Sequence, residues 1–456
     1  MSVIVRFAPS PTGKLHIGNV RAALLNWLFA KRHAGKFILR LDDTDRERST
    51  DANAQSIRDD LTWLGLTWDD TFRQSDRTQR YEEIKGQLIA AGRLYPCYES
   101  EDELDRKRKR QMARGLPPLY DRAGYRLTPD ERGKIEATGL RPHWRFLLAN
   151  TAPHDATKIV PTPVRWKDLV RGDQSIDMSS MSDPVLARAD GTFLYTFTSV
   201  VDDIDTKISH IIRGEDHVTN SGVQAQIFEA IGGKVPHMAH YSLFVGSQGE
   251  ALSKRLGSLS VEGFREGGLE AMAVNSLAAL IGTSDAVHPV AALPELAATF
   301  DLGKLSRSPS RFDTAELYAL NAKLLHMLPY ADMAARLTSL GVDGGEAFWL
   351  AVRGNLEILA DAVTWQQVVK GPLVPVIENA AFCNAASALL PPEPWNADTW
   401  GVWTNAVKAA TGAKGRALFH PLRLALTGLE NGPELKALLP LIGRAQAVER
   451  LAGKAA

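Results

Sequence analysis

The chain has 456 residues, too many for one hydrophobic core, so we expect roughly three to five domains or subdomains. It is 45% hydrophobic and 23% charged, as in soluble globular proteins, and its zero formal net charge gives no global sign of nucleic-acid binding. Two cysteines far apart in sequence exclude a disulfide framework and a four-thiolate zinc site. The N-terminus does not resemble a signal peptide and no apolar run reaches transmembrane length, so we expect a cytoplasmic protein without a membrane partner.

The first 65 residues alternate between strand and helix patterns. Residues 3–9 are rich in β-branched and aromatic side chains and predict a strand, and apolar residues then recur at helical spacing from residue 16 to Gly35. Residues 37–43 predict a second strand, and 49–65 predict a helix that opens with capping residues. This alternation predicts an α/β fold with a parallel, Rossmann-like sheet.

The rest of the chain divides by its pattern. Residues 81–181 begin with charged helical sequence and continue with short strand-like pieces, which indicates an α+β insertion after residues 1–80. Strand and helix patterns resume over 182–242 and are expected to rejoin the first sheet. Residues 243–315 follow, and 316–456 read as an all-helical region.

The stretch "SPTGKLHIGN" raises the question of a phosphate site. Gly13 and Gly18 match half of a P-loop, but Asn19 and Val20 stand where that loop needs Lys and Ser/Thr, so we exclude it. His16 and Gly18 instead open a helix, whose N-terminal N–H groups attract phosphate. Taken alone, the pattern fits a capping turn with a surface histidine better.

A second candidate is "LSKR", in which Ser253, Lys254 and Arg255 combine a hydroxyl with two adjacent cations. Such a group suits the charge of a phosphoryl transition state. Taken alone, the sequence fits a solvated basic loop better.

The order and places of "HIGN" and "LSKR" resemble the paired signatures of class I aminoacyl-tRNA synthetases. Four longer segments are similar to bacterial-type glutamyl-tRNA synthetases, and the similarity spans most of the chain, more loosely over 342–392. These segments are "RFAPSPTGKLHIGNVRAALLNWLFA", "LRLDDTDRERS", "YTFTSVVDDIDTKISHIIRGEDHVTN" and "LFHPLRLALTG".

The resemblance implies an ATP- and Mg²⁺-dependent enzyme of translation that joins L-glutamate to the 3′ end of tRNA-Glu through glutamyl-adenylate. It implies a monomer, and leaves open whether tRNA-Gln is also charged. It divides the chain into a catalytic domain in two halves (1–80 and 182–242), an inserted acceptor-end-binding domain (81–181), a stem-contact region with the LSKR loop (243–315) and a helical anticodon-binding region (316–456).

Several rival functions share part of these sequence features. Glutaminyl-tRNA synthetases tend to read "PEPNG" and "DDTN" where this chain has "PSPTG" and "DDTD", which favours glutamate. A truncated paralogue that glutamylates a tRNA base, and small nucleotidyltransferases with a His-x-Gly-His loop, lack the long helical region. A catalytically impaired relative that only binds RNA stays open, because Ala251 replaces the first lysine of the second signature.

The resemblance assigns one group of residues to ATP. Asn19 stands where the class pattern has histidine, and Lys254 would steady the α-phosphate while Ser253 and Arg255 support its loop. The ATP-binding set is Pro9, Ser10, His16, Gly18, Asn19 and Lys254, and the catalytic set is His16, Gly18, Asn19, Ser253, Lys254 and Arg255.

A second group is assigned to glutamate. A substrate with two carboxylates and one ammonium needs two cations and one anion, and Arg6, Asp42 and Arg213 all follow predicted strands, where parallel sheets bind ligands. For each of these residues taken alone, a salt bridge at the rim of the sheet is as good an interpretation as glutamate binding. The full glutamate-binding set is Arg6, Ala8, Ser10, Asp42, Tyr195, Ser199, Arg213 and His217.

Three further features concern tRNA and metal. The basic run Arg106, Lys107, Arg108, Lys109 and Arg110 suits tRNA phosphates, or equally a solvated helix face. The tryptophans Trp365, Trp395, Trp400 and Trp403 suit a helical core better than stacking on anticodon bases. Some relatives bind zinc through Cys-x-Cys in the insertion; here only Cys97 is present, so no zinc or other protein-bound metal is predicted.

Overall fold

The structure is a computed structural model that describes residues 2–152, 155–250, 252 and 259–456, without the side chains of 156 and 157. Its Cα atoms group into two compact units. The N-terminal unit comprises Met1–Phe264, Asn275–Val287 and Ala292–Asp313, and the C-terminal unit comprises Arg265–Val274, His288–Ala291 and Thr314–Ala456.

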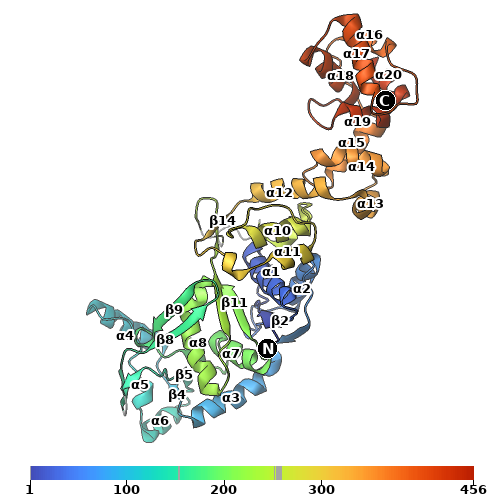
Figure 1. The fold of residues 1–456 in the computed structure, drawn as a ribbon. Helices are drawn as coiled ribbons and strands as arrows, with labels where there is room; N and C mark the ends of the chain where they lie inside the picture. Colours follow the sequence, from blue (N-terminus) through green and yellow to red (C-terminus); the bar gives the residue numbers. More distant parts are fainter. Residues whose placement is uncertain (1, 153–154, 251, 253–258) are drawn as a thin grey trace. The chain divides into compact units, whose positions relative to one another are not determined.

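The N-terminal unit begins with the predicted alternation of strands and helices (Figure 1). Strands β1 and β2 pair in parallel, with Val5 opposite Phe37, and β2 pairs in parallel with β3. The parallel α/β arrangement expected from the sequence is therefore confirmed. The elements are β1 (Ile4–Phe7), α1 (Ile17–Arg32), β2 (Lys36–Leu41), α2 (Asp51–Trp63) and β3 (Asp70–Arg73).

The next segment builds a second sheet and one edge of a third. Strand β5 pairs antiparallel with β4 and with β10, while the β8–β9 hairpin adds to β12. Helix α4 carries the basic run, as expected. The elements are α3 (Thr78–Ala90), β4 (Leu94–Cys97), α4 (Glu101–Ala113), α5 (Ala123–Arg126), α6 (Pro129–Glu136), β5 (His143–Phe146), β6 (Thr151–Ala152), β7 (Asp155–Ile159), β8 (Pro163–Asp168), β9 (Gly172–Asp177) and β10 (Val185–Ala187).

Strand β11 lies beside β1, although its strand pairing places it in a separate sheet with the order β11–β12–β8–β9. The Ser209 N–H donates to the Ile4 carbonyl at 2.9 Å, and β11 pairs in parallel with β12, so the carboxyl ends of β1 and β11 lie close together. The elements that follow are α7 (Tyr195–Asp205), β11 (His210–Gly214), α8 (Val218–Ile231), β12 (His237–Tyr241), β13 (Phe244–Gly246), α9 (Val261–Glu266), α10 (Ala271–Leu280), α11 (Leu293–Thr299) and β14 (Ser310–Phe312).

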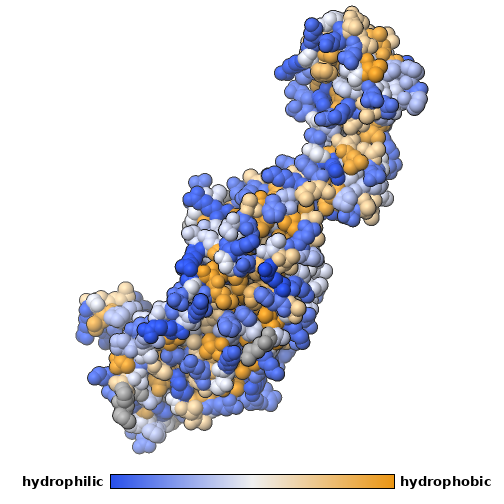
Figure 2. Space-filling view, in the orientation of Figure 1, coloured by the Kyte–Doolittle hydropathy of each residue, from blue (hydrophilic) through white to orange (hydrophobic). Residues whose placement is uncertain are grey.

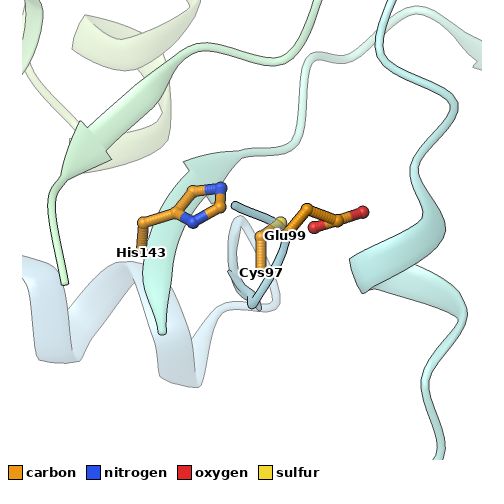
Figure 3. Close-up of side chains that lie close together, drawn as sticks. All are labelled: Cys97, Glu99 and His143. Atoms are coloured by element: carbon orange, nitrogen blue, oxygen red, sulfur yellow. The ribbon is translucent and has the colours of Figure 1, made fainter. Parts of the chain in front are cut away.

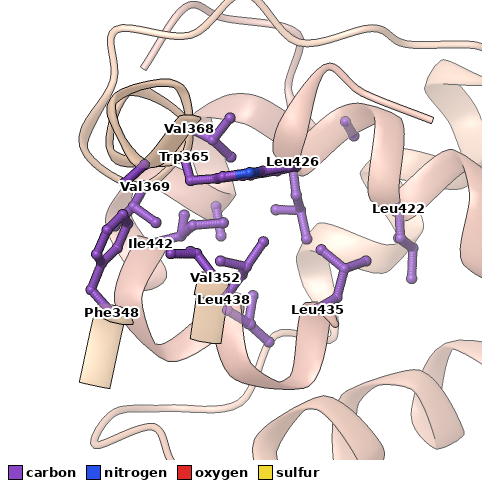
Figure 4. Close-up of a cluster of buried hydrophobic side chains, with 14 of the residues drawn as sticks. Phe348, Val352, Trp365, Val368, Val369, Leu422, Leu426, Leu435, Leu438 and Ile442 are labelled. Atoms are coloured by element: carbon purple, nitrogen blue, oxygen red, sulfur yellow. The ribbon is translucent and has the colours of Figure 1, made fainter. Parts of the chain in front are cut away.

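The C-terminal unit is helical, with its own apolar core (Figure 4). Trp365 and Trp403 are buried in that core, and Trp395 and Trp400 pack against it, which confirms the preference for core packing. Its helices are α12 (Thr314–Met327), α13 (Tyr330–Ser339), α14 (Gly345–Val352), α15 (Asp361–Lys370), α16 (Ala380–Ala388), α17 (Thr399–Thr411), α18 (Arg416–Thr427), α19 (Leu435–Ile442) and α20 (Arg444–Leu451).

Apolar and polar side chains are mixed on the face of the N-terminal unit seen in Figure 2. Within the described parts of the chain, none of the helices combines the length and the apolar character needed to cross a bilayer.

Two adjacent residues of α17 provide a test of the helical core. Trp403 is fully buried and its indole N–H donates to the Ala386 carbonyl at 2.8 Å, whereas Val402 is 60% exposed. Trp403→Ala is expected to lower the free energy of unfolding by about 3–5 kcal/mol through the lost contacts and the cavity. Val402→Ala should change it by less than about 0.5 kcal/mol. Urea denaturation measures both, and equal losses would contradict the assigned core.

Candidate active site

A cleft of about 670 Å³ opens at the carboxyl ends of β1 and β11 and the start of α1. It brings together most of the residues that the sequence assigned to glutamate and ATP. Asp42 and Ser199 are absent from its lining among the described residues. The assigned residues that line it are Arg6, Ala8, Pro9, Ser10, His16, Gly18, Asn19, Tyr195, Arg213 and His217.

His16 is the N-cap of α1. Its Nδ1 accepts the Gly18 N–H at 3.1 Å, and the Asn19 carboxamide oxygen accepts the His16 N–H at 3.1 Å, which forms a capping box. Because Nδ1 is an acceptor, a neutral ring carries its proton on Nε2, and burial lowers the pKa of His16. A Cβ on Gly18 would lie 2.8 Å from His16 Cε1, so glycine is needed for the cap itself.

Arg213 is buried at the end of β11 and has no carboxylate within salt-bridge distance in the described part of the chain. Its Nη1 donates to the Tyr195 hydroxyl at 3.2 Å, and its Nη2 donates to Ser221 Oγ at 2.6 Å. Burial lowers the pKa of Arg213, Tyr195 opposes that effect, and the charge of Arg6 adds to it. Two cations therefore face one cleft.

Arg6 has a different environment, because it belongs to a buried ion cluster. Its Nε donates to Asp203 at 3.1 Å, and Arg40 Nη1 donates to the same carboxylate at 2.8 Å. Arg40 also donates to both oxygens of Asp42, at 2.6 and 3.1 Å. Burial raises the pKa of Asp42 to about 6, and the charge and hydrogen bonds of Arg40 oppose this effect.

Two assigned residues are thus committed elsewhere. The Asp42 carboxylate is directed to Arg40, and the Ser199 hydroxyl donates to the Tyr195 carbonyl at 2.6 Å and accepts from Gln224 at 2.9 Å. Both positions support the cleft, and their assignment to glutamate stays a prediction. Ser253, Lys254 and Arg255 of the second signature, and Ala251, lie outside the described residues.

The sequence interpretation missed Asp203, which holds both Arg6 and Arg40. Asp202 is equally buried and accepts from Arg77, Gln74 and the Tyr81 hydroxyl. The acidic pair of "VVDDID", directly after two valines, was the available signal, because buried carboxylates require partners.

The basic run lies on α4, where Arg106, Arg108, Lys109 and Arg110 are exposed. Lys107 pairs with Glu99 at 3.3 Å and with Asp121 at 3.1 Å, and Lys109 pairs with Asp105 at 2.8 Å. The acidic neighbours therefore engage two of the five cations. The remaining three arginines are in contact with solvent.

Cys97, Glu99 and His143 bring potential ligand atoms within 4.8 Å of one another (Figure 3). The Tyr120 hydroxyl already contacts Cys97 Sγ at 3.3 Å and Glu99 Oε1 at 2.9 Å. Burial raises the pKa of Cys97 to about 12, while His143 Nε2 and Glu99 Oε2 are buried without a hydrogen-bond partner among the described residues. Three donors are one fewer than a closed structural zinc site uses, so this set fits such a site poorly.

Known protein families match most of the chain. Residues 2–319 match the family model of the class I tRNA synthetases (E and Q), catalytic domain, and 378–454 match an anticodon binding domain. The chain is 57% identical to "Glutamate--tRNA ligase 2" of Methylobacterium radiotolerans, over 99% of this chain and 100% of that protein. It is also 57% identical to "Glutamate--tRNA ligase 1" of Parvibaculum lavamentivorans, over 99% and 98%.

A solved structure is similar along the whole length. The glutamate tRNA ligase of Elizabethkingia meningosepticum, crystallised with its amino acid, superposes with a TM-score of 0.85 at 25% identity, over 99% of this chain and 98% of that one. The fold is that of a class I aminoacyl-tRNA synthetase. Within that class, the chain belongs to the glutamate and glutamine (E and Q) family.

The ion cluster under the cleft can be tested with two substitutions in α7. Asp203→Asn leaves the buried guanidinium groups of Arg6 and Arg40 short of one charge, so it is expected to cost about 3–5 kcal/mol of unfolding free energy. Asp205→Asn changes a partly exposed carboxylate paired with Arg77 and Arg80 and should cost less than about 1 kcal/mol. Chemical denaturation of both variants measures the difference. A loss of unfolding free energy in Asp203→Asn as small as that in Asp205→Asn would contradict a stabilising role of the Asp203 ion cluster.

Proposed function

We propose that this chain ligates L-glutamate to the 3′ end of tRNA-Glu, using ATP and passing through glutamyl-adenylate. The relatives named as glutamate–tRNA ligases support this function. The observation that carries it is Arg213, a buried guanidinium that faces the cleft without a carboxylate partner in the described structure. A glutamate carboxylate would supply the missing charge and a bidentate partner.

In the first step, the glutamate α-carboxylate attacks the α-phosphorus of ATP in line and pyrophosphate leaves. The described residues position the reactants and stabilise charge, and no side-chain nucleophile is required. The N-terminus of α1 and the Nε2–H of His16 face the phosphates, and Lys254 is assigned to the α-phosphate. Mg²⁺ bound to the triphosphate would neutralise part of its charge.

In the second step, the terminal ribose hydroxyl of tRNA attacks the carbonyl carbon of glutamyl-adenylate, the bond from that carbon to the phosphate oxygen breaks, and AMP and a proton are released as the ester forms. We assign phosphate contacts of the acceptor end to the exposed arginines of α4, because a basic helix face gains affinity by releasing counterions. The helical region after residue 316 is assigned to the anticodon.

Whether tRNA-Gln is also a substrate is decided by charging the two purified tRNAs side by side. We further propose that the enzyme acts as a monomer in the cytoplasm.

The amino-acid assignment is tested by pyrophosphate exchange in the presence of tRNA. Wild-type protein should exchange with glutamate and far more weakly with glutamine. Arg213→Gln should raise the KM for glutamate roughly 10- to 100-fold, the value of a charged hydrogen-bonded contact, while the KM for ATP stays within about two-fold. Exchange with neither amino acid would overturn the proposed function. An unchanged glutamate KM in the variant would remove Arg213 from the site.

We also propose that the insertion folds without zinc, because the Tyr120 hydroxyl links the thiol of Cys97 to Glu99. Purified protein should contain far less than one zinc per chain by elemental analysis, and a chelator should leave its melting temperature unchanged. Cys97→Ser is the matched control, because it preserves size and hydrogen bonding. One zinc per chain that disappears in Cys97→Ser would contradict the proposal.

A further inference from the structure

We propose that His240 is a positioning residue for Arg213, acting in a buried chain of hydrogen bonds that ends at Asp168. This inference rests on the proposed function, in which Arg213 binds a glutamate carboxylate. His240 lies in β12, Asp168 ends the neighbouring strand β8, and Ser221 lies in the first turn of α8. All three side chains are buried, and among the described residues none of them lines the cleft.

The series of hydrogen bonds starts at the carboxylate of Asp168, which is held in a fixed orientation. Asp168 Oδ1 accepts the backbone N–H groups of Val170, Arg171 and His240 at 3.0, 2.9 and 3.1 Å. Its other oxygen, Oδ2, lies 2.5 Å from His240 Nδ1. Burial opposes ionisation, but these hydrogen bonds outweigh it and lower the pKa of Asp168 to about 2. An ionised Oδ2 requires a proton on His240 Nδ1.

The opposite ring nitrogen then has a lone pair. Burial lowers the pKa of His240, Asp168 opposes this effect, and the charges of Arg213 and Arg171 add to it, so the ring is neutral. His240 Nε2 lies 2.8 Å from Ser221 Oγ and 3.4 Å from Arg213 Nε. Ser221 Oγ in turn accepts from Arg213 Nη2 at 2.6 Å.

Every donor in this order meets an acceptor. Arg213 Nη2–H donates to Ser221 Oγ, the Ser221 hydroxyl donates to His240 Nε2, and His240 Nδ1–H donates to Asp168. The hydroxyl proton has one alternative, the His217 carbonyl at 3.1 Å, and Arg213 Nε–H then takes the Nε2 lone pair. In both arrangements the Arg213 guanidinium is held by neutral groups, and the balancing negative charge stays on Asp168.

This arrangement explains how Arg213 is held without losing its ligand-binding groups. A carboxylate in direct contact, such as Asp203 beside Arg6, would compete with the substrate for the guanidinium. The neutral hydrogen-bonded groups fix the orientation of the Arg213 guanidinium. A substrate carboxylate can then be its first direct anionic partner. Pre-organisation of this kind lowers the cost of binding.

Asp168→Asn gives a nearly isosteric test. Because three backbone N–H groups require an oxygen at the Oδ1 position, the new amide nitrogen must face His240 Nδ1 and donate to it. The histidine proton then moves to Nε2, where it opposes the protons of Ser221 and Arg213. Ser221→Ala is the second variant, and it removes the link to Nη2 by deleting one oxygen atom.

Aminoacylation is measured with the full chain and tRNA while glutamate, ATP and tRNA are varied in turn. Each variant should raise the KM for glutamate by roughly 10-fold, the value of one charge-assisted hydrogen bond, and change the KM for ATP and tRNA by less than about two-fold. Arg213→Gln is the reference. If it raises the glutamate KM while Asp168→Asn and Ser221→Ala do not, the inference is wrong and the proposed function stands. KM values for all three substrates rising together would indicate a merely structural role and would also overturn it.

Discussion

The burial of guanidinium groups is the constraint on which the cleft depends. Arg6, Arg40 and Arg213 all lie within the α/β unit, and an unpaired charge there would cost several kcal/mol. The chain meets this cost in two ways. Arg6 and Arg40 share the carboxylate of Asp203, whereas Arg213 reaches a carboxylate only through Ser221 and His240. Arg6 and Arg40 are therefore fixed by a shared carboxylate, and Arg213 is left available to an anionic ligand.

Position along the strands made the cationic part of the site predictable. Arg6 and Arg213 lie near the carboxyl ends of the neighbouring strands β1 and β11, where α/β folds bind ligands, and His16 caps the helix beside them. The strand and helix pattern of the first 65 residues was predictable for the same reason, since its hydrophobic periods are strong and its breaks are marked by glycine. The basic helix α4 and the buried tryptophans also followed from composition and spacing.

The remaining features depend on choices between partners that the sequence does not record. Asp42 ends a strand at the same edge as Arg6, yet Arg40, two residues earlier, takes both of its oxygens. Ser199 is one turn from Tyr195 and uses its hydroxyl within the helix. Asp168 lies in a segment that looked like part of an insertion, and only the pairing of β8 with β12 brings it to His240. Each case is a competition settled by tertiary contacts.

The start of α1, where we propose that the phosphates of ATP bind, also limits how much positive charge the cleft holds. A protonated histidine at the start of α1 would add a full charge to the partial positive charge of the helix end and would face Arg6 and Arg213 across the same space. Burial instead favours the neutral ring, and the Gly18 N–H holds Nδ1, so the proton on Nε2 is directed away from the helix. We propose that this neutral Nε2–H donates a hydrogen bond to the phosphate oxygens and holds pyrophosphate less firmly than a cation would. The glycine is thus required by the histidine, and the motif works as one unit.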